Sequence, residues 1–183
     1  MAKLSVKNQL YDKMDQQISR QIILLTKLIN EYAQTDNKQQ RKKILGKVVV
    51  IGAYIKRRSN LIFIAENQSV IPVKELELCF EETIRNLELN GIAAGFAASV
   101  KKIPSEMAMR MYDFFEAVIE ESLDHLSALS VTLKQENEKL VLSISAECEA
   151  DLTETTGSYG AEAEQDFDGA WLLSFSVEGG ESS

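Results

Sequence analysis

The feature that most constrains the fold is an apolar stripe near the start of the chain. Between Val6 and Tyr32, apolar side chains recur every three or four residues. The members of this stripe are Leu10, Met14, Ile18, Ile22, Leu25, Leu28 and Tyr32. Because residues three and four apart share one face of an α-helix, the stripe predicts a single long helix with one buried side.

A second long helix is predicted directly after the first. Asp36 and Asn37 are good N-cap residues, so one of them is expected to begin a helix that runs to about Glu66. Its apolar positions are Ile44, Val48, Ile51, Ile55 and Ile62, widened by Leu45, Val49 and Ala53. One hairpin cannot cover so broad a face. We therefore expect residues 7–33 and 37–66 to form a homodimer, with a four-helix bundle at its centre.

The remaining sequence alternates between helix and strand patterns. Ile71-Pro72 breaks the helical pattern, and helices are expected from Val73 to Leu89 and from Pro104 to about Ser127. Strands are expected over residues 92–99, 129–133, 139–145 and 170–177, and the second and third of these should form a β-hairpin. Residues 147–169 are predicted to be a mobile loop and residues 179–183 a frayed tail.

These elements predict an α+β fold with two parts. A long antiparallel helical hairpin (residues 1–68) precedes a small α/β sandwich (residues 69–183). Charge follows the same division, since residues 1–60 contain 13 Lys and Arg against 4 Asp and Glu, whereas residues 61–183 contain 7 against 24. The acidic second part repels phosphates and the chain has no recognition motif, so no nucleic-acid partner is expected.

Several classes of protein are excluded by what the sequence lacks. No run of about 18 apolar residues occurs, so no membrane-spanning segment is expected. No signal peptide is recognised at the start, and we expect a cytoplasmic protein or the cytoplasmic part of a membrane sensor. Cys79 and Cys148 lie far apart in the sequence, form no Cys-x-x-Cys motif and have no His nearby that would suggest a zinc site. Both are therefore expected to be free thiols.

The order of the elements and two segments of sequence carry a resemblance to a known family. The segments are residues 50–60, which read VIGAYIKRRSN, and residues 112–116, which read YDFFE. Together they resemble the cytoplasmic core of bacterial sensor histidine kinases over residues 7–178. The resemblance implies a dimerisation and phosphotransfer hairpin followed by a Bergerat-type ATPase-like domain. It also implies ATP and Mg²⁺ as the cofactors of the family, and a response regulator or partner kinase as its partner.

The phosphoacceptor motif departs from the family pattern at its central residue. Residues 10–16 read Leu-Tyr-Asp-Lys-Met-Asp-Gln, where the family has Leu-His-Asp-x-x-Gly-Gln. The resemblance therefore places Tyr11 at the phosphoacceptor and Asp12 at the acid that orients it. A phenol with a pKa of about 10 is a poor nucleophile at neutral pH, so autophosphorylation is not expected. Alternatively, both residues are only partly exposed positions on a long helix.

The resemblance places two further site residues in the second part of the chain. Glu116 matches the base that polarises the nucleophile, and Glu120 stands where the family has an Asn that holds Mg²⁺. Two carboxylates one helical turn apart suit a hard cation, although they equally suit a solvated helix face. The glycine-rich ATP boxes are missing, since no glycine follows Ser145 until Gly157. We therefore expect no cofactor, with ATP binding lost or very weak.

Three functions follow from these expectations. The first is a two-component signalling protein that dimerises and docks its partner near Tyr11, Gln17 and Arg20, regulating phosphotransfer without performing it. The second is an active ATP-dependent kinase with Glu116 as base and Glu120 on Mg²⁺. The third is a purely structural dimerisation module, whose binding surface would tolerate charge reversal at Arg20 or Lys13.

Overall fold

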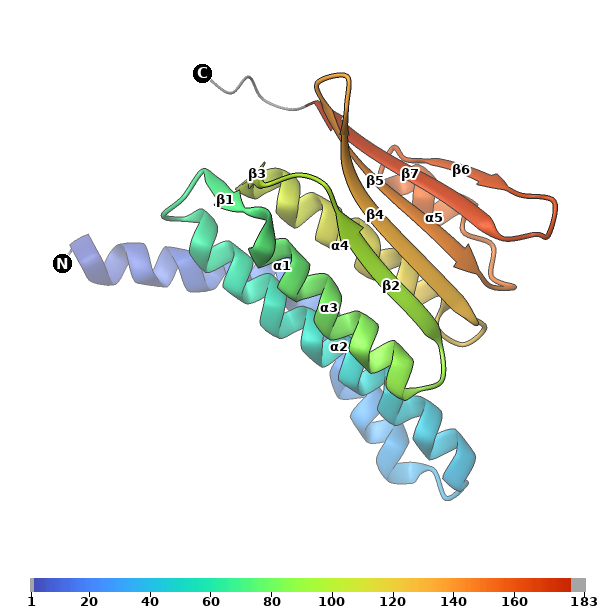
Figure 1. Cartoon of the computed structure of the whole chain (residues 1–183). Helices are drawn as coiled ribbons and strands as arrows, with labels where there is room; N and C mark the ends of the chain where they lie inside the picture. Colours follow the sequence, from blue (N-terminus) through green and yellow to red (C-terminus); the bar gives the residue numbers. More distant parts are fainter. Residues whose placement is uncertain (1, 179–183) are drawn as a thin grey trace.

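The chain begins with two long antiparallel helices. The computed structural model describes residues 2–178, except for the side chains of residues 2–11 and 13–17. Helix α1 (Ala2–Gln34) and helix α2 (Lys38–Ala65) form this hairpin (Figure 1). They pack through Leu28, Ile44 and Ile51. Asn37 is the N-cap of α2, because its side-chain oxygen accepts a hydrogen bond from the Gln40 N–H over 2.9 Å. The predicted helical hairpin is confirmed.

The second part of the chain is a mixed sheet with helices on one face. Its elements are β1 (Val70–Pro72), α3 (Val73–Leu89), β2 (Ala93–Ala98), β3 (Lys102–Pro104), α4 (Ser105–Ser122), β4 (Ala128–Glu136), β5 (Lys139–Glu147), α5 (Thr153–Ser158), β6 (Glu162–Gln165) and β7 (Trp171–Glu178). Five strands form the sheet in the order β2-β4-β5-β7-β6, in which only the β2–β4 pair is parallel. Helices α3 and α4 cover one face of this sheet, and α2 packs against both helices (Figure 1). The predicted α+β class is confirmed.

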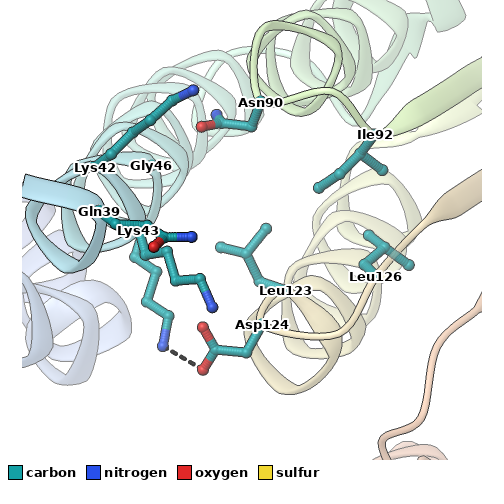
Figure 2. A pocket seen from close by; sticks show the side chains of 10 residues that line it. Gln39, Lys42, Lys43, Gly46, Asn90, Ile92, Leu123, Asp124 and Leu126 are labelled. Atoms are coloured by element: carbon teal, nitrogen blue, oxygen red, sulfur yellow. Dashed lines mark hydrogen bonds and ion pairs between the residues drawn. The ribbon is translucent and has the colours of Figure 1, made fainter.

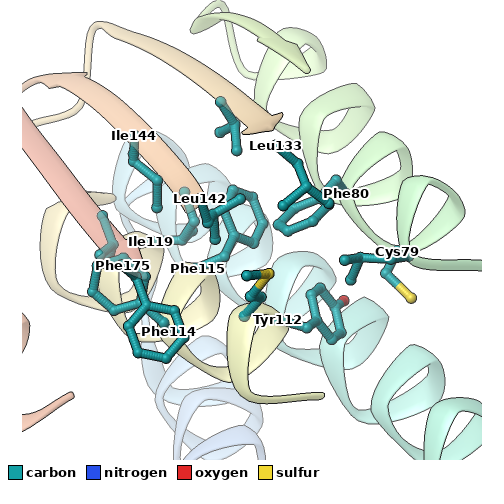
Figure 3. Close-up of a cluster of buried hydrophobic side chains, with 14 of the residues drawn as sticks. Cys79, Phe80, Tyr112, Phe114, Phe115, Ile119, Leu133, Leu142, Ile144 and Phe175 are labelled. Carbon is teal, nitrogen blue, oxygen red and sulfur yellow. The ribbon is translucent and has the colours of Figure 1, made fainter. Parts of the chain in front are cut away.

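The core lies between the sheet and the helices. Its largest fully buried side chains are aromatic and include Phe80, Tyr112, Phe114, Phe115 and Phe175 (Figure 3). Helix α2 contributes Val50, Tyr54, Leu61 and Ile62 to the same core. The hairpin and the sheet domain therefore share one apolar interior, and the division of the chain at residue 68 stays a prediction.

The structure corrects the prediction of a loop over residues 147–169. Helix α5 forms there because Leu152 is fully buried and its carbonyl accepts a hydrogen bond from the Thr156 hydroxyl over 2.6 Å. Strand β6 follows and pairs with β7 at the edge of the sheet. All four β6 residues are exposed, and for this reason the segment shows no apolar alternation in sequence.

Smaller differences concern the ends of elements. Helix α4 ends at Ser122 rather than near Ser127, and the short strands β1 and β3, which pair with each other, were not predicted. Both cysteines are free, as expected, and burial raises the pKa of the Cys79 thiol to about 12. The tail predicted at residues 179–183 lies outside the described residues. Within the described part of the chain, no helix is long and apolar enough to cross a membrane.

Candidate functional site

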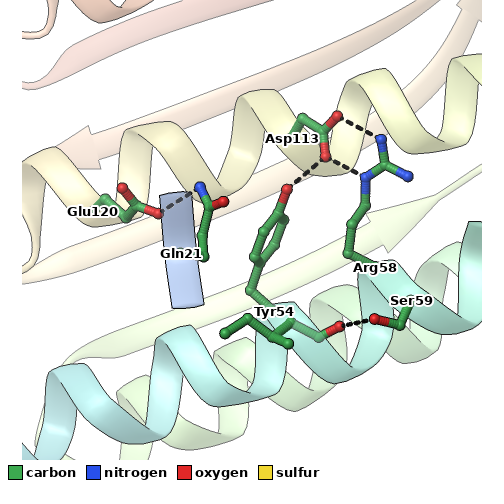
Figure 4. A network of polar contacts seen from close by, with 7 residues as sticks. Gln21, Tyr54, Arg58, Ser59, Asp113 and Glu120 are labelled. Carbon is green, nitrogen blue, oxygen red and sulfur yellow. Dashed lines mark hydrogen bonds and ion pairs between the residues drawn. The ribbon is translucent and has the colours of Figure 1, made fainter. Parts of the chain in front are cut away.

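Helix α4 carries three carboxylates on the face opposite the sheet. Asp113, Glu116 and Glu120 are spaced by three and four residues, so they share one side of the helix. The other side of α4 buries Phe114 and Phe115 among the side chains of the core. The acidic side points instead toward α1 and α2 (Figure 4). Glu116 and Glu120, to which the resemblance assigns catalytic roles, therefore face the helical hairpin.

Asp113 is held by two side chains of α2. The Arg58 guanidinium donates two hydrogen bonds, from Nε to Oδ1 over 2.6 Å and from Nη2 to Oδ2 over 3.0 Å. The Tyr54 hydroxyl donates to the same Oδ1 over 2.8 Å (Figure 4). Burial, followed by the charge of Asp113, raises the pKa of Tyr54, so its hydroxyl keeps the proton that it donates. This three-residue contact fastens α4 to α2.

Glu116 lies one turn further along α4 and is sealed from solvent. Its side chain is 1% exposed, and neither carboxylate oxygen has a hydrogen-bond partner among the described residues. Burial raises the pKa of Glu116 well above its ordinary range, and the nearby charges of Glu120 and Asp113 act in the same direction. An uncharged, enclosed carboxyl group is poorly placed to act as a general base toward a bound substrate.

Glu120 is engaged by helix α1. Its Oε1 accepts a hydrogen bond from the Gln21 side-chain amide over 3.3 Å, and its Oε2 lies 3.7 Å from Arg20 Nη2. Burial raises the pKa of Glu120, while the Gln21 hydrogen bond and the Arg20 charge oppose this rise. The contact ties the first helix of the hairpin to α4, as the Arg58–Asp113 pair ties the second.

The residues near α4 do not fit a bound magnesium ion. Glu116 is enclosed and burial raises its pKa, and Glu120 already pairs with Arg20 and Gln21. Within residues 2–178, described side chains form no group of three or more His, Cys, Asp or Glu placed to hold a metal. A hard cation prefers several ionised oxygen ligands, which this arrangement does not offer.

The segment that replaces the glycine-rich boxes does not fit a triphosphate. A cavity of about 590 Å³ lies between the end of β5 and the β6–β7 turn. Its lining includes four carboxylates, from Glu147, Glu149, Asp166 and Asp168. His125 also lines this cavity and lies 3.8 Å from Glu149, with more than half of its side chain exposed. Carboxylates concentrated in this way repel an anionic ligand unless a cation intervenes.

Of the two residues predicted at the phosphoacceptor motif, the structure describes the side chain of Asp12 but not that of Tyr11. Tyr11 lies in α1, but its side chain is outside the described residues, as is that of Gln17. Asp12 is exposed, and no described hydrogen bond or ion pair joins it to the carboxylates of α4. The roles that the resemblance assigns to Tyr11, Asp12, Glu116 and Glu120 stay predictions. What the structure brings together is Glu116, Glu120 and an unpredicted neighbour, Asp113.

Sequence reasoning missed the contact among Tyr54, Arg58 and Asp113. A signal was present, because Arg58 stands four residues after Tyr54 and in phase with the buried Ile51 and Ile62. Arginine is almost never fully buried without a partner, so an arginine on an apolar stripe predicts a buried acid elsewhere. Asp113, flanked by two aromatic residues, was the candidate acid.

Comparison with known proteins gives likenesses of fold only. No protein-family model and no curated protein matches the chain. A bacterial phosphotransferase aligns with a TM-score of 0.47 and 8% identity, over 97% of this chain and 98% of that chain. The histidine kinase domain of the blue-light activated kinase EL346 from Erythrobacter litoralis aligns with a TM-score of 0.47 and 14% identity, over 87% and 94%. Histidine kinase ThkA, solved in complex with response regulator protein TrrA, aligns with a TM-score of 0.41 and 12% identity, over 96% and 63%. Likenesses this distant carry no conclusion about activity or partners.

Replacing Arg58 with Ala should lower the free energy of unfolding by about 2–4 kcal/mol, because Asp113 loses the guanidinium that pairs with it while its carboxylate stays mostly buried. Urea unfolding measures the change. Arg57→Ala is the matched control, since the Arg57 side chain is 26% exposed against 6% for Arg58, and its partner Glu82 keeps a second ion pair with Lys56. Its loss should cost about 1 kcal/mol or less. Equal losses in the two variants would contradict the role given to the Arg58–Asp113 pair.

Glu116→Gln should change how stability depends on pH. The folded state holds the Glu116 proton to a higher pH than the unfolded chain, so wild-type stability falls as pH rises above the ordinary glutamate pKa of about 4.3. Glutamine does not titrate. The variant should therefore gain stability relative to wild type as pH rises above about 5, by up to about 1.4 kcal/mol per pH unit.

Urea unfolding at a series of pH values tests this expectation. Glu121→Gln, at an exposed position on the same helix, serves as the control and should differ from wild type by an amount that changes little with pH. A difference between Glu116→Gln and wild type that is flat across the series would mean that Glu116 is ionised in the folded protein.

Proposed function

We propose that the chain is a two-component signalling protein with a histidine-kinase-like fold that does not phosphorylate itself. It acts by forming a homodimer and by docking a response regulator or a partner kinase. The observation that carries this proposal is the enclosure of α4, the helix that bears Glu116 and Glu120, between the sheet and the hairpin.

The enclosure of α4 prevents two contacts that a kinase needs. The base of such an enzyme has to meet its nucleophile, and the metal ligand has to meet the nucleotide phosphates. Here the core covers one side of α4, while the contacts of Arg58 and Gln21 hold the hairpin over the other. A nucleotide would have to displace these contacts to reach Glu116, so the proposed activity is regulatory.

The exposed side of the hairpin supports a homodimer. On α2, Leu45 and Val49 are more than 40% exposed and lie on one face with Gly52. On α1, Ile22 and Ile29 are likewise exposed and are separated by Thr26. No described residue from outside this stretch of α2 lies within 4 Å of the position that a Gly52 Cβ would occupy, so the backbone of α2 is open to a partner helix there. We propose that two copies bury these faces against each other in a four-helix bundle.

The partner is proposed to dock on the α1 side of the hairpin, near Tyr11, Gln17 and Arg20. The Arg20 side chain is 81% exposed, and its Nη2 lies 3.7 Å from the Oε2 of Glu120. A cation that is both accessible and linked to α4 offers a partner an electrostatic contact with the folded core. ThkA, the kinase named above, was solved in complex with a response regulator, and a partner of that class is the one proposed here.

Val49→Glu should dissociate the homodimer, because it places a charge in the centre of the proposed apolar interface. Sedimentation equilibrium should report a mass near twice 20.5 kDa for wild type and near 20.5 kDa for the variant. Phe167→Glu, on the fully exposed β6–β7 turn, is the control and should leave the mass of the dimer unchanged. A monomeric wild type at about 100 μM would contradict the homodimer.

Millimolar Mg²⁺-ATP should leave the melting temperature unchanged. A ligand at about 100 times its dissociation constant stabilises a fold by about 2.7 kcal/mol, which a thermal melt readily detects. A clear upward shift that Glu116→Gln abolishes would instead support the active-kinase alternative.

Receiver domains encoded in the source genome should include at least one that binds the wild-type chain in calorimetric titration. Arg20→Glu should weaken this binding by about tenfold or more, because a carboxylate replaces the guanidinium that is proposed to contact the receiver domain. Lys27→Glu makes a similar change two turns further along α1 and is the control. Absence of any receiver partner contradicts the docking proposal, and tolerance of Arg20→Glu favours a structural dimerisation module.

A further inference from the structure

A pocket forms where α2 extends past the ends of α3 and α4. Gln39, Lys43 and Gly46 lie on the same face of α2 as Val50 and Tyr54, which are buried further along. Because α3 ends at Leu89 and α4 ends at Ser122, neither helix covers the beginning of this face. The result is a cavity of about 350 Å³ between the three helices (Figure 2).

The walls of this pocket combine positive charge with an apolar floor. Lys42, Lys43 and Lys47 line it from α2, while Ile92 and Leu126, both buried, form part of the opposite wall (Figure 2). The side-chain amides of Gln39 and Asn90 add hydrogen-bonding groups. The chemistry is therefore that of a site for an anion with an apolar body.

The charge of the pocket is not cancelled from within. The only carboxylate in its lining belongs to Asp124, and this group lies 2.6 Å from the Lys47 Nζ. For Lys42 and Lys43, the described part of the chain provides no carboxylate within ion-pair distance. Two ammonium groups are thus left to meet a ligand, and their number matches the two charges of a phosphate monoester.

Gly46 shapes the wall between α2 and α3. A Cβ at this position would lie 3.1 Å from the Asn90 Oδ1, closer than ordinary van der Waals contact. The bare backbone of α2 therefore lets the Asn90 side chain sit at the pocket wall. That side chain is oriented by a hydrogen bond from its Nδ2 to the Asn86 carbonyl over 2.8 Å.

We propose that this pocket, between the start of α2 and the ends of α3 and α4, binds a small phosphate monoester with an apolar body. Its volume falls within the range of about 300–1,000 Å³ that is typical of small-molecule sites. The phosphate is held by Lys42 and Lys43, and the apolar body lies against Ile92 and Leu126. A ligand bound here contacts both the hairpin and the sheet domain. The proposal is independent of the partner-docking function above.

Titration of the full chain with phenyl phosphate, followed by ¹H–¹⁵N NMR, tests the site. Saturable shifts are expected at the amides of Gly46, Asn90 and Ile92. The double variant Lys42→Gln, Lys43→Gln should bind at least about tenfold more weakly, because each lost charge-assisted contact reduces affinity. The double variant Lys27→Gln, Lys134→Gln removes two exposed lysines elsewhere and should bind as wild type does.

Three further measurements test whether the phosphate group and the apolar body both contribute to binding in this pocket. Inorganic phosphate and benzoate should each bind at least about tenfold more weakly than phenyl phosphate. Gly46→Leu should abolish the shifts by filling the pocket, while circular dichroism checks that the helices remain. The proposal is overturned if phenyl phosphate gives no saturable shift, if inorganic phosphate or benzoate binds equally well, or if both double variants lose affinity to the same extent.

Discussion

The contact of Arg58 and Tyr54 with Asp113 is the interaction on which the arrangement of this protein depends. It joins the helical hairpin to the sheet domain with three hydrogen bonds to the Asp113 carboxylate, two of them from the charged Arg58 guanidinium. Arg58 is 5% exposed, so an unpaired guanidinium here would carry a large desolvation cost. Its planar fork also restricts how α4 can rotate against α2. The two parts of the chain are therefore held in one orientation as well as in contact.

The orientation decides what happens to the other acidic residues of α4. With Asp113 fixed against α2, the next turn of the helix carries Glu116 into the interior, where neither oxygen finds a partner. One turn later, Glu120 meets Gln21 and Arg20 of α1. A face that resembles part of a kinase site is thus used for packing. Burial and proximity to other carboxylates keep Glu116 protonated, which is the opposite of what a general base requires.

Most of the fold was predictable from local pattern, and the exceptions have identifiable reasons. Helix α3 was predicted with its observed bounds, because Pro72 precedes it and Gly91, with a φ of 82°, follows it. Strand β6 was missed, because an edge strand with both faces exposed needs no apolar alternation. The candidate site was predictable only as residue types on one helix face. Which of those residues are exposed depends on where α1 and α2 pack against α4. The spacing of apolar residues along α4 does not contain that information.

The sequence by itself determined the helical hairpin, the mixed order of helices and strands, and the absence of the histidine and glycine motifs of the family that it resembles. These are local properties, because each depends on apolar spacings of two to four residues or on the identity of single side chains. The tertiary structure alone decided that Glu116 is sealed, that Glu120 is paired, and that lysines of α2 line a pocket beside the ends of α3 and α4. The Gln21–Glu120 contact joins residues 99 positions apart and the Arg58–Asp113 contact residues 55 positions apart, while the pocket brings the start of α2 to the ends of α3 and α4. Burial and charge at such positions are set by neighbours that only the packed chain brings together.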